Sequence, residues 1–258
     1  MLRSALFNVA FYANTALFLI VGAPLLLAPR SWAMAGLVAH ARVSLWLMRV
    51  IVGTQLEVRG RDHLPEGAYL VAAKHQSAWD TFALIPIFKD PAMVMKAELG
   101  SIPLYGWFSR KFEHLLIQRE KGPAALKRLI RDARARAAQG REIVIFPEGT
   151  RRPPNAPADY KPGAVALYES LELPCVPIAL NSGLYWPRQS QMRYPGSIVV
   201  QILPPIPPGL PRAVFRERLQ TAIETASKDL ILEARESRNA PPMPVTAQPE
   251  AAPIKETM

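Results

Sequence analysis

A histidine and an aspartate lie five positions apart in the stretch AAKHQSAWDTF, as His75 and Asp80. The pair directly follows an apolar run, Tyr69–Ala73, that has the composition of a buried strand, so we expect the histidine at a sheet edge. If the following turn brings the carboxylate back to the ring, Asp80 accepts the proton of one imidazole nitrogen, and the other nitrogen can act as a base. The alternative is a buried histidine beside a carboxylate that merely begins a helix.

The sequence offers no convincing protein nucleophile near this pair. Ser77 lies two residues from His75 but lacks the Gly-x-Ser-x-Gly elbow that exposes a hydrolase serine. Cys175 lies inside an apolar run, as a core residue would, and as the single cysteine it cannot form an intrachain disulfide. The simplest chemistry is therefore deprotonation of a bound substrate hydroxyl that attacks directly. A serine- or cysteine-dependent lipid hydrolase is the alternative enzyme class.

A second motif, FPEGTR at residues 146–151, also follows an apolar run. Its glycine, Gly149, indicates a turn in which backbone N–H groups, together with Arg151 and Arg152, can converge on an anion. Glu148 can orient a second substrate hydroxyl or the loop itself, and Thr150 belongs to the same turn. The alternative is an ordinary turn with solvated arginines.

Two further cations stand near the ends of predicted strands. Lys96 lies in VMKAEL and Arg119 in LIQR. Each alone has the character of a surface charge. Together with the arginines of the FPEGTR turn they can surround a phosphate, whose geometry suits the guanidinium fork.

These motifs lie on a pattern of short apolar strands that alternate with helical stretches, which indicates a layered α/β domain. The predicted strands are Gln55–Arg59, Tyr69–Ala73, Ala92–Met95, Leu115–Gln118, Ile143–Phe146, Val176–Leu180 and Ile198–Leu203, and the predicted helices are Ala78–Phe88, Ala124–Gln139, Ala164–Leu171 and Arg212–Arg235. We expect a membrane anchor over residues 1–53, a catalytic domain over residues 54–236 and a disordered, Pro- and Ala-rich tail over residues 237–258.

The N-terminal region is apolar enough for a membrane. From Ser4 to Pro29 it carries no charge, and a second apolar stretch follows in which Arg42 and Arg49 share one helical face. A cleaved secretory signal is disfavoured because the apolar segment exceeds a signal core of about 7–15 residues. A hairpin that dips into one leaflet and two spanning helices both remain open.

The formal net charge of +10 fits attraction to anionic lipid, worth about 1 kcal/mol for each nearby Lys or Arg. Nucleic acid would also attract a basic chain. The sequence contains no aromatic-interleaved basic groove, zinc knuckle or recognition helix, which argues against that partner.

In order along the chain, HQSAWD, KAELG, LIQR, FPEGTR and VPIA resemble the motifs of glycerolipid acyltransferases, specifically the 1-acyl-sn-glycerol-3-phosphate acyltransferases of bacterial membranes. The resemblance covers about Gln55 to Leu203 and implies a mixed sheet flanked by helices, with an N-terminal membrane-embedded helical hairpin. It implies acyl transfer to a lysophospholipid from acyl-CoA or acyl carrier protein, without cofactor, metal or covalent intermediate. The expected location is the bacterial inner membrane, with the catalytic domain facing the cytoplasm.

The resemblance also implies roles for single residues. His75 would be the general base and Asp80 its orienting partner. The remaining site residues divide into a phosphate group, Lys96, Arg119 and Arg151; an acceptor-site group, Glu148, Gly149 and Thr150; and Pro177, which would help to form an acyl-side wall.

One block departs from the family pattern. Members often have a glycine before the strand and an acid before the arginine, whereas this chain has Glu113 and His114 before the strand and Gln118 beside Arg119. The departure weakens the phosphate assignment of Arg119 more than the assignment of His75. A different acceptor, such as lyso-ornithine lipid, is therefore the nearest alternative, and a non-catalytic lipid-binding module is a further one.

Overall fold

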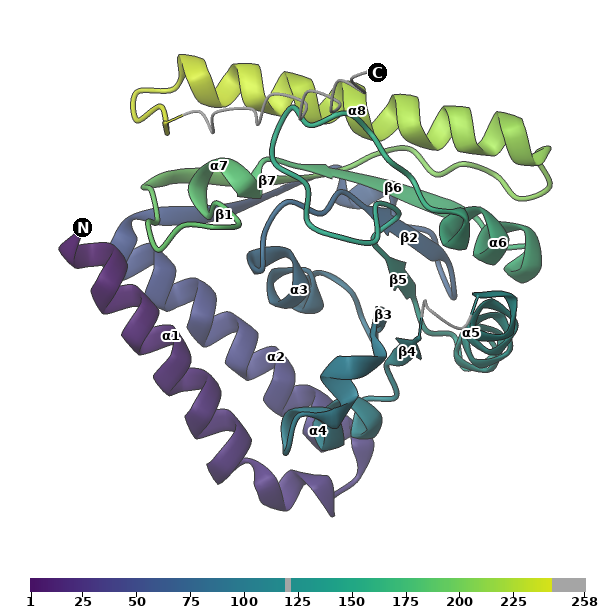
Figure 1. The fold of residues 1–258 in the computed structure, drawn as a ribbon, viewed down its shortest axis with the longest axis horizontal. Helices are drawn as coiled ribbons and strands as arrows, with labels where there is room; N and C mark the ends of the chain where they lie inside the picture. The colour runs from purple at the N-terminus through teal and green to yellow at the C-terminus, as the bar shows by residue number, and fades with distance from the viewer. Residues whose placement is uncertain (119–121, 243–258) are drawn as a thin grey trace, which may run out of the picture.

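The computed structural model, which describes residues 1–118 and 122–242, has a mixed sheet of seven strands in the order β1-β7-β6-β2-β5-β3-β4 (Figure 1). The strands are β1 Thr54–Arg59, β2 Leu70–Ala73, β3 Ala92–Lys96, β4 Leu115–Ile117, β5 Ile143–Ile145, β6 Cys175–Leu180 and β7 Gly196–Ile202. Strands β6, β2, β5, β3 and β4 run parallel to one another, while β7 is antiparallel to β6 and β1 is parallel to β7. The carboxyl ends of the five parallel strands therefore meet at one sheet edge.

Helices cover both faces of this sheet, which is why its central strands are apolar throughout. All four residues of β2 are inaccessible to solvent, and they alternate between two cores. Leu70 and Ala72 pack beneath α5, α6 and the first half of α8, whereas Val71 and Ala73 face α3 and the N-terminal helices. The helices are α1 Leu2–Val21, α2 Arg30–Leu47, α3 Trp79–Ala83, α4 Tyr105–Lys111, α5 Gly122–Ala137, α6 Pro162–Leu171, α7 Ser182–Tyr185 and α8 Arg212–Glu236, with short 3-10 turns at Ala23–Leu26, Arg61–His63, Ile85–Ile87 and Ala97–Ser101.

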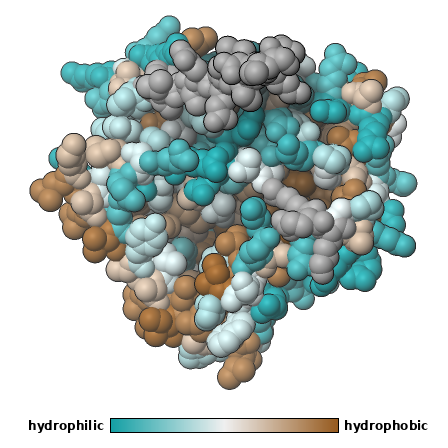
Figure 2. Space-filling model, in the orientation of Figure 1, coloured by the Kyte–Doolittle hydropathy of each residue, from teal (hydrophilic) through white to brown (hydrophobic). Residues whose placement is uncertain are grey.

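The two N-terminal helices form a hairpin that leans against the domain (Figure 1). Leu2–Val21 and Arg30–Val52, the latter ending in a π-helical turn at Met48–Val52, are each long and apolar enough to cross a membrane. Large apolar side chains of both helices remain exposed, and apolar residues gather over this corner of the molecule (Figure 2). The hairpin tip packs on α4, where Phe108 and Phe112 meet Phe18, Leu25 and Leu26.

An ion pair holds the hairpin against one edge of the sheet, opposite to the edge that carries the His75 and FPEGTR motifs. Arg30, the first residue of α2, donates two hydrogen bonds to the carboxylate of Asp90, which precedes β3. The buried guanidinium of Arg141 lies 3.3 Å from the same carboxylate. Near it, the half-buried His114 accepts a hydrogen bond from the N–H of Met93 through Nδ1. The hairpin is thus fixed to the domain by charge as well as by apolar packing.

All seven predicted strands are present, with ends displaced by a residue or two. The predicted helix Ala78–Phe88 is wrong in length: α3 ends at Ala83 and a 3-10 turn follows, because Pro86 has no N–H with which to continue the helix. Helices α4 and α7 were not predicted. Helix α8 ends one residue beyond its predicted end, and most of the predicted tail, residues 243–258, lies outside the described residues.

Candidate active site

The structure brings His75 and Asp80 into contact. The chain leaves β2 at Ala73, turns through residues 74–78 and begins α3 at Trp79, so Asp80 falls in the first helical turn. Its Oδ2 lies 2.9 Å from Nδ1 of His75. Because an ionised carboxylate only accepts hydrogen bonds, Nδ1 carries the proton and Nε2 carries the lone pair of the neutral ring. The His75 side chain is 12% exposed, so it lies at the protein surface while Asp80 is fully buried.

The carboxylate of Asp80 also organises the turn that surrounds it. Its Oδ2 accepts hydrogen bonds from the backbone N–H groups of Gln76, at 2.8 Å, and Ser77, at 2.9 Å. Its Oδ1 accepts a hydrogen bond from the hydroxyl of Ser182 in α7. These donors fix the orientation of the carboxylate. The imidazole therefore faces a carboxylate that is held from three sides.

The peptide of His75 is held as firmly as its ring. Its N–H donates to Oε2 of Glu148 at 2.9 Å, and its C=O accepts from the N–H of Arg152 at 2.8 Å. The ring stacks on Phe146, with centroids 4.0 Å apart and an interplanar angle of 19°. Since residues 146–152 follow β5, the FPEGTR motif clamps the histidine from the neighbouring strand.

Glu148 is turned inward. Its side chain is fully buried, Oε2 accepts from the His75 N–H, and Oε1 lies 2.8 Å from Nζ of Lys74. Burial raises the pKa of this carboxyl, and the Lys74 ammonium and the His75 N–H oppose that shift. The structure therefore favours the expectation that Glu148 orients the loop over the expectation that it contacts the acceptor.

The parallel strands bring the remaining motifs to the same edge. Lys96 is exposed at the end of β3, two strands from β2. In the turn after β5, Gly149 has a positive φ of 67° that suits glycine, and Thr150 is exposed. Arg151 is half-buried, and its C=O accepts a hydrogen bond from Arg188. Arg119 lies outside the described residues.

Pro177 lies elsewhere in the layer. It is buried within β6, where its Cα pairs with that of Ala72, and its C=O accepts from the N–H of Leu203. Pro177 therefore lies inside the sheet, level with Ala72, which is the residue before the last one of β2. A contribution of Pro177 to an acyl-side wall stays a prediction.

The alternative nucleophiles are poorly placed. Ser77 is fully buried, and its hydroxyl oxygen accepts a hydrogen bond from the N–H of Trp79 at the start of α3. Cys175 is fully buried at the opposite end of β6, paired with Leu70, and burial raises the pKa of its thiol far above the ordinary value. Neither side chain is presented to a substrate.

Several residues support the pair through contacts that were not predicted: Lys74, Arg152, Ser182 and Gly183, of which Arg152 was named only as a cation near the anion site. Gly183 donates its N–H to Oε1 of Gln76, and a methyl group there would lie 2.9 Å from the Gln76 Cβ. A signal for the last two was available, because the polar run Asn-Ser-Gly directly follows the apolar run of β6, as His75 follows that of β2. The first two lie beside recognised motif residues but have no pattern of their own.

The chain is similar in sequence to known proteins. Residues 55–181 match the family model described as Acyltransferase. The chain is 39% identical over 163 residues to 1-acyl-sn-glycerol-3-phosphate acyltransferase from Pseudomonas aeruginosa, a match that covers 63% of each protein. It is 29% identical over 207 residues to 1-acyl-sn-glycerol-3-phosphate acyltransferase alpha from Homo sapiens, over 78% of this chain and 72% of that one. The first match spans less than two thirds of the bacterial relative.

The fold also has a solved counterpart. The crystal structure of the 1-acyl-sn-glycerophosphate (LPA) acyltransferase PlsC from Thermotoga maritima superposes with a TM-score of 0.77. The superposition covers 92% of this chain and 99% of that one, at 20% sequence identity. The mixed sheet with flanking helices is therefore a known architecture, as the sequence predicted.

Proposed function

We propose that the chain is a member of the acyltransferase family whose model residues 55–181 match, and that it acylates the free sn-2 hydroxyl of 1-acyl-sn-glycerol-3-phosphate to give phosphatidic acid. The relatives named for this activity support the choice of acceptor. The observation that carries the chemistry is the contact between Nδ1 of His75 and Asp80, which leaves Nε2 as the basic nitrogen.

The proposed mechanism uses one base and no protein nucleophile. Nε2 of His75 takes the proton of the acceptor hydroxyl as its oxygen attacks the thioester carbonyl carbon. The tetrahedral oxyanion then collapses, the C–S bond breaks, and the imidazolium returns the proton to the leaving sulfur. Asp80 stabilises the imidazolium while it exists. No metal ion or cofactor takes part, and acyl-CoA or acyl carrier protein is the acyl donor.

Binding of the acceptor phosphate is assigned to the cations at the same sheet edge. Arg151 follows β5 directly beside the residues that hold His75, and Lys96 ends the next strand. A phosphate held there would place the glycerol hydroxyls toward the base, with Gly149 and Thr150 in the intervening turn. Guanidinium groups suit this task because their paired N–H donors match phosphate oxygens.

We place the protein at the inner membrane, with the site reached from the cytoplasmic leaflet. The apolar hairpin supports attachment, and the net charge of +10 supports an anionic surface. The exposed side chains of Ile102 and Trp107, beside the hairpin tip, extend the apolar surface onto the catalytic domain. Such placement spares the acyl chains exposure to water, which costs about 0.8 kcal/mol per CH₂.

An acceptor panel tests the proposed activity. The full chain in mixed micelles is incubated with labelled acyl-CoA and, in separate reactions, lysophosphatidic acid, lyso-ornithine lipid or lysophosphatidylcholine. We expect diacyl product from lysophosphatidic acid. Product from lyso-ornithine lipid alone would show that this lipid, and not lysophosphatidic acid, is the acceptor. If no diacyl product forms from any of the three lipids, with either acyl-CoA or acyl carrier protein as donor, the chain is a lipid-binding module.

A matched pair of variants tests the mechanism. His75→Ala is expected to lose about 100- to 10,000-fold in kcat, the usual contribution of a general base. Ser77→Ala should keep most of the activity, since the Ser77 hydroxyl oxygen only accepts a bond from Trp79. A serine hydrolase would show the reverse order.

A further inference from the structure

A buried lysine stands directly before the proposed base. Lys74 is 2% exposed, and its ammonium lies 2.8 Å from Oε1 of Glu148. The same ammonium donates to both carboxylate oxygens of Glu224 in α8, at 2.7 Å and 3.0 Å. The lysine therefore joins the strand end that carries His75, the FPEGTR turn and the long C-terminal helix.

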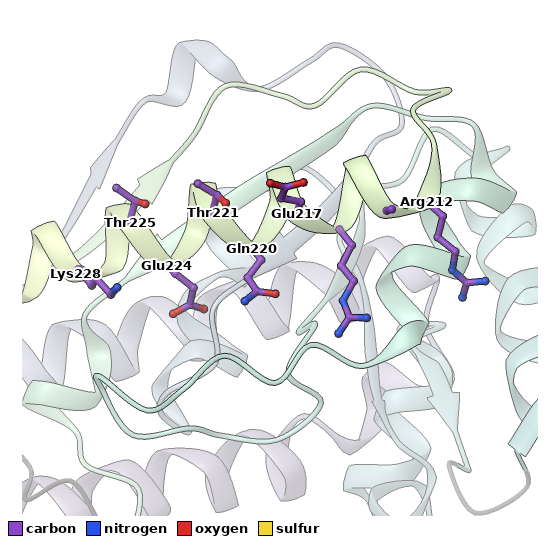
Figure 3. Close-up of a pocket in the computed structure, with 9 residues that line it drawn as sticks. Arg212, Glu217, Gln220, Thr221, Glu224, Thr225 and Lys228 are labelled. Carbon is purple, nitrogen blue, oxygen red and sulfur yellow. The ribbon is translucent and has the colours of Figure 1, made fainter.

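The outer end of this chain of contacts is open to solvent. The Glu224 side chain is 20% exposed and also accepts a hydrogen bond from the Tyr160 hydroxyl at 3.0 Å. Glu224 lines an open cleft along α8 and projects from the underside of that helix in Figure 3. The described residues that line the cleft all belong to α8, and His75 is not among them. We call Lys74, Glu148, Glu224 and Tyr160 the lysine cluster.

Stability alone is a weak reason for such a cluster. Desolvation offsets much of the attraction within a buried ion pair, and apolar side chains of similar volume often stabilise a core as well. Its position supplies a stronger reason, because Oε2 of Glu148, the oxygen that does not face Lys74, accepts the N–H of His75. An ionised carboxylate is the stronger acceptor for that N–H, and a neighbouring ammonium favours ionisation.

We propose that Lys74, held by Glu224, is a positioning residue that keeps Glu148 on the His75 N–H and so fixes the backbone that carries the proposed base. Lys74 touches no substrate in this role. The inference rests on the proposed function only for its effect on rate.

Removal of the lysine has a defined electrostatic consequence. The carboxylates of Glu148 and Glu224 then lose the cation that both contact, while the N–H of His75 still donates to Glu148. Burial already raises the pKa of Glu148, and loss of the ammonium raises it further. In Lys74→Met the carboxyl is therefore protonated at a pH at which it is ionised in the natural chain.

Amide hydrogen exchange tests the positioning independently of catalysis. In Lys74→Met, the His75 amide should exchange at least about tenfold faster than in the natural chain, while the amides of Gln76 and Ser77, held by Asp80, should be unchanged. The matched control is Glu233→Gln, which removes another α8 carboxylate from a sheet cation, Arg59, at the surface. Equal exchange of the His75 amide in all three proteins would overturn the inference.

The pH dependence of kcat supplies the second readout. At pH 7, Lys74→Met should lose at least about tenfold in kcat, which is about 1.4 kcal/mol of barrier, and this loss should become smaller as the pH rises and Glu148 ionises. Glu233→Gln should follow the natural profile. A folded Lys74→Met with unchanged kcat, or with the same loss at every pH, contradicts the proposal.

If Lys74→Met does not fold, the variant Glu224→Gln tests the positioning role of Lys74. It should accelerate exchange of the His75 amide and lower kcat several-fold with both KM values unchanged, whereas indistinguishable behaviour from Glu233→Gln would refute the role. Absence of diacyl product in the natural chain would instead refute the proposed function, and the exchange experiment would still judge the lysine cluster.

Discussion

Replacement of Asp80 by asparagine is the most informative single change, because three donors converge on one of its oxygens. The ring of His75 and the N–H groups of Gln76 and Ser77 all point to Oδ2. An amide NH₂ cannot replace that oxygen without facing these donors. The side-chain carbonyl of the introduced asparagine is therefore expected to occupy the place of Oδ2, with its NH₂ toward the oxygen of Ser182, which can accept a hydrogen bond. The tautomer of His75 is preserved in this arrangement, and only the negative charge is lost.

The magnitude follows from that difference. A hydrogen bond to an ionised group contributes about 1.5–3 kcal/mol, and one between neutral groups about 0.5–1.5 kcal/mol. The difference of about 1–2 kcal/mol predicts about a 5- to 30-fold loss of kcat in Asp80→Asn. Asp80→Ala removes the orienting acceptor altogether, so it is expected to approach the loss of about 100- to 10,000-fold predicted for His75→Ala.

The assay measures kcat at pH 8 for both variants, with thermal unfolding as the check on folding. Asp80→Ala should also be less stable, since two buried N–H groups lose their acceptor and each such loss costs about 1–3 kcal/mol. Equal losses of kcat in the two variants would refute the argument from converging donors. A change of less than twofold in Asp80→Asn would refute a role for the charge.

Four further outcomes are expected. Arg151→Ala should raise the acceptor KM about tenfold or more with little change in the donor KM, and equal effects on both would discredit the anion site. Gly183→Ala should raise the activation barrier by more than it lowers the free energy of unfolding, because its new methyl group pushes Gln76 out of place. Measurements of kcat and of unfolding on the same variant give the two free energies. Burial, and then Arg141, lower the pKa of His114 to about 3. Between about pH 6.5 and pH 3 the unfolded chain therefore binds a proton that the folded chain does not, and the free energy of unfolding decreases as the pH falls through this range. His114→Asn should recover about 1–2 kcal/mol of unfolding free energy at pH 5 and little at pH 7.5. Trp107→Ser should lower the fraction of protein that sediments with anionic vesicles several-fold. Val214→Ser, an apolar-to-polar change on α8, should leave that fraction unchanged.

The sheet was predictable because each strand is a short apolar run ending in polar residues. The parallel pairing of β2 with β5 brings motifs separated by some seventy residues, at His75 and FPEGTR, to neighbouring strand ends. The local spacing of His75 and Asp80 allowed their contact but did not require it, because the turn at residues 74–78 decides where the carboxylate lies. Short helices such as α4 and α7 escaped prediction because so few residues carry no measurable periodicity.

The supporting contacts were not predictable for a different reason. Lys74 is a charged residue whose partners lie on other elements, 74 and 150 residues away in the sequence for Glu148 and Glu224. A lysine beside a recognised histidine has the character of a surface charge until the fold supplies those carboxylates. The family resemblance implied that Glu148 helps to form the acceptor site, whereas its side chain turns into the protein.

His75 is held by contacts at its amide, its carbonyl and its ring. Its position can therefore stay the same while the preference for the acceptor changes. The side chains of Lys96 and Arg151, which we propose bind the acceptor phosphate, are not among the groups that hold the imidazole. Under this proposal, substitutions at these two cations can change the preferred head group while the contacts of His75 stay as they are.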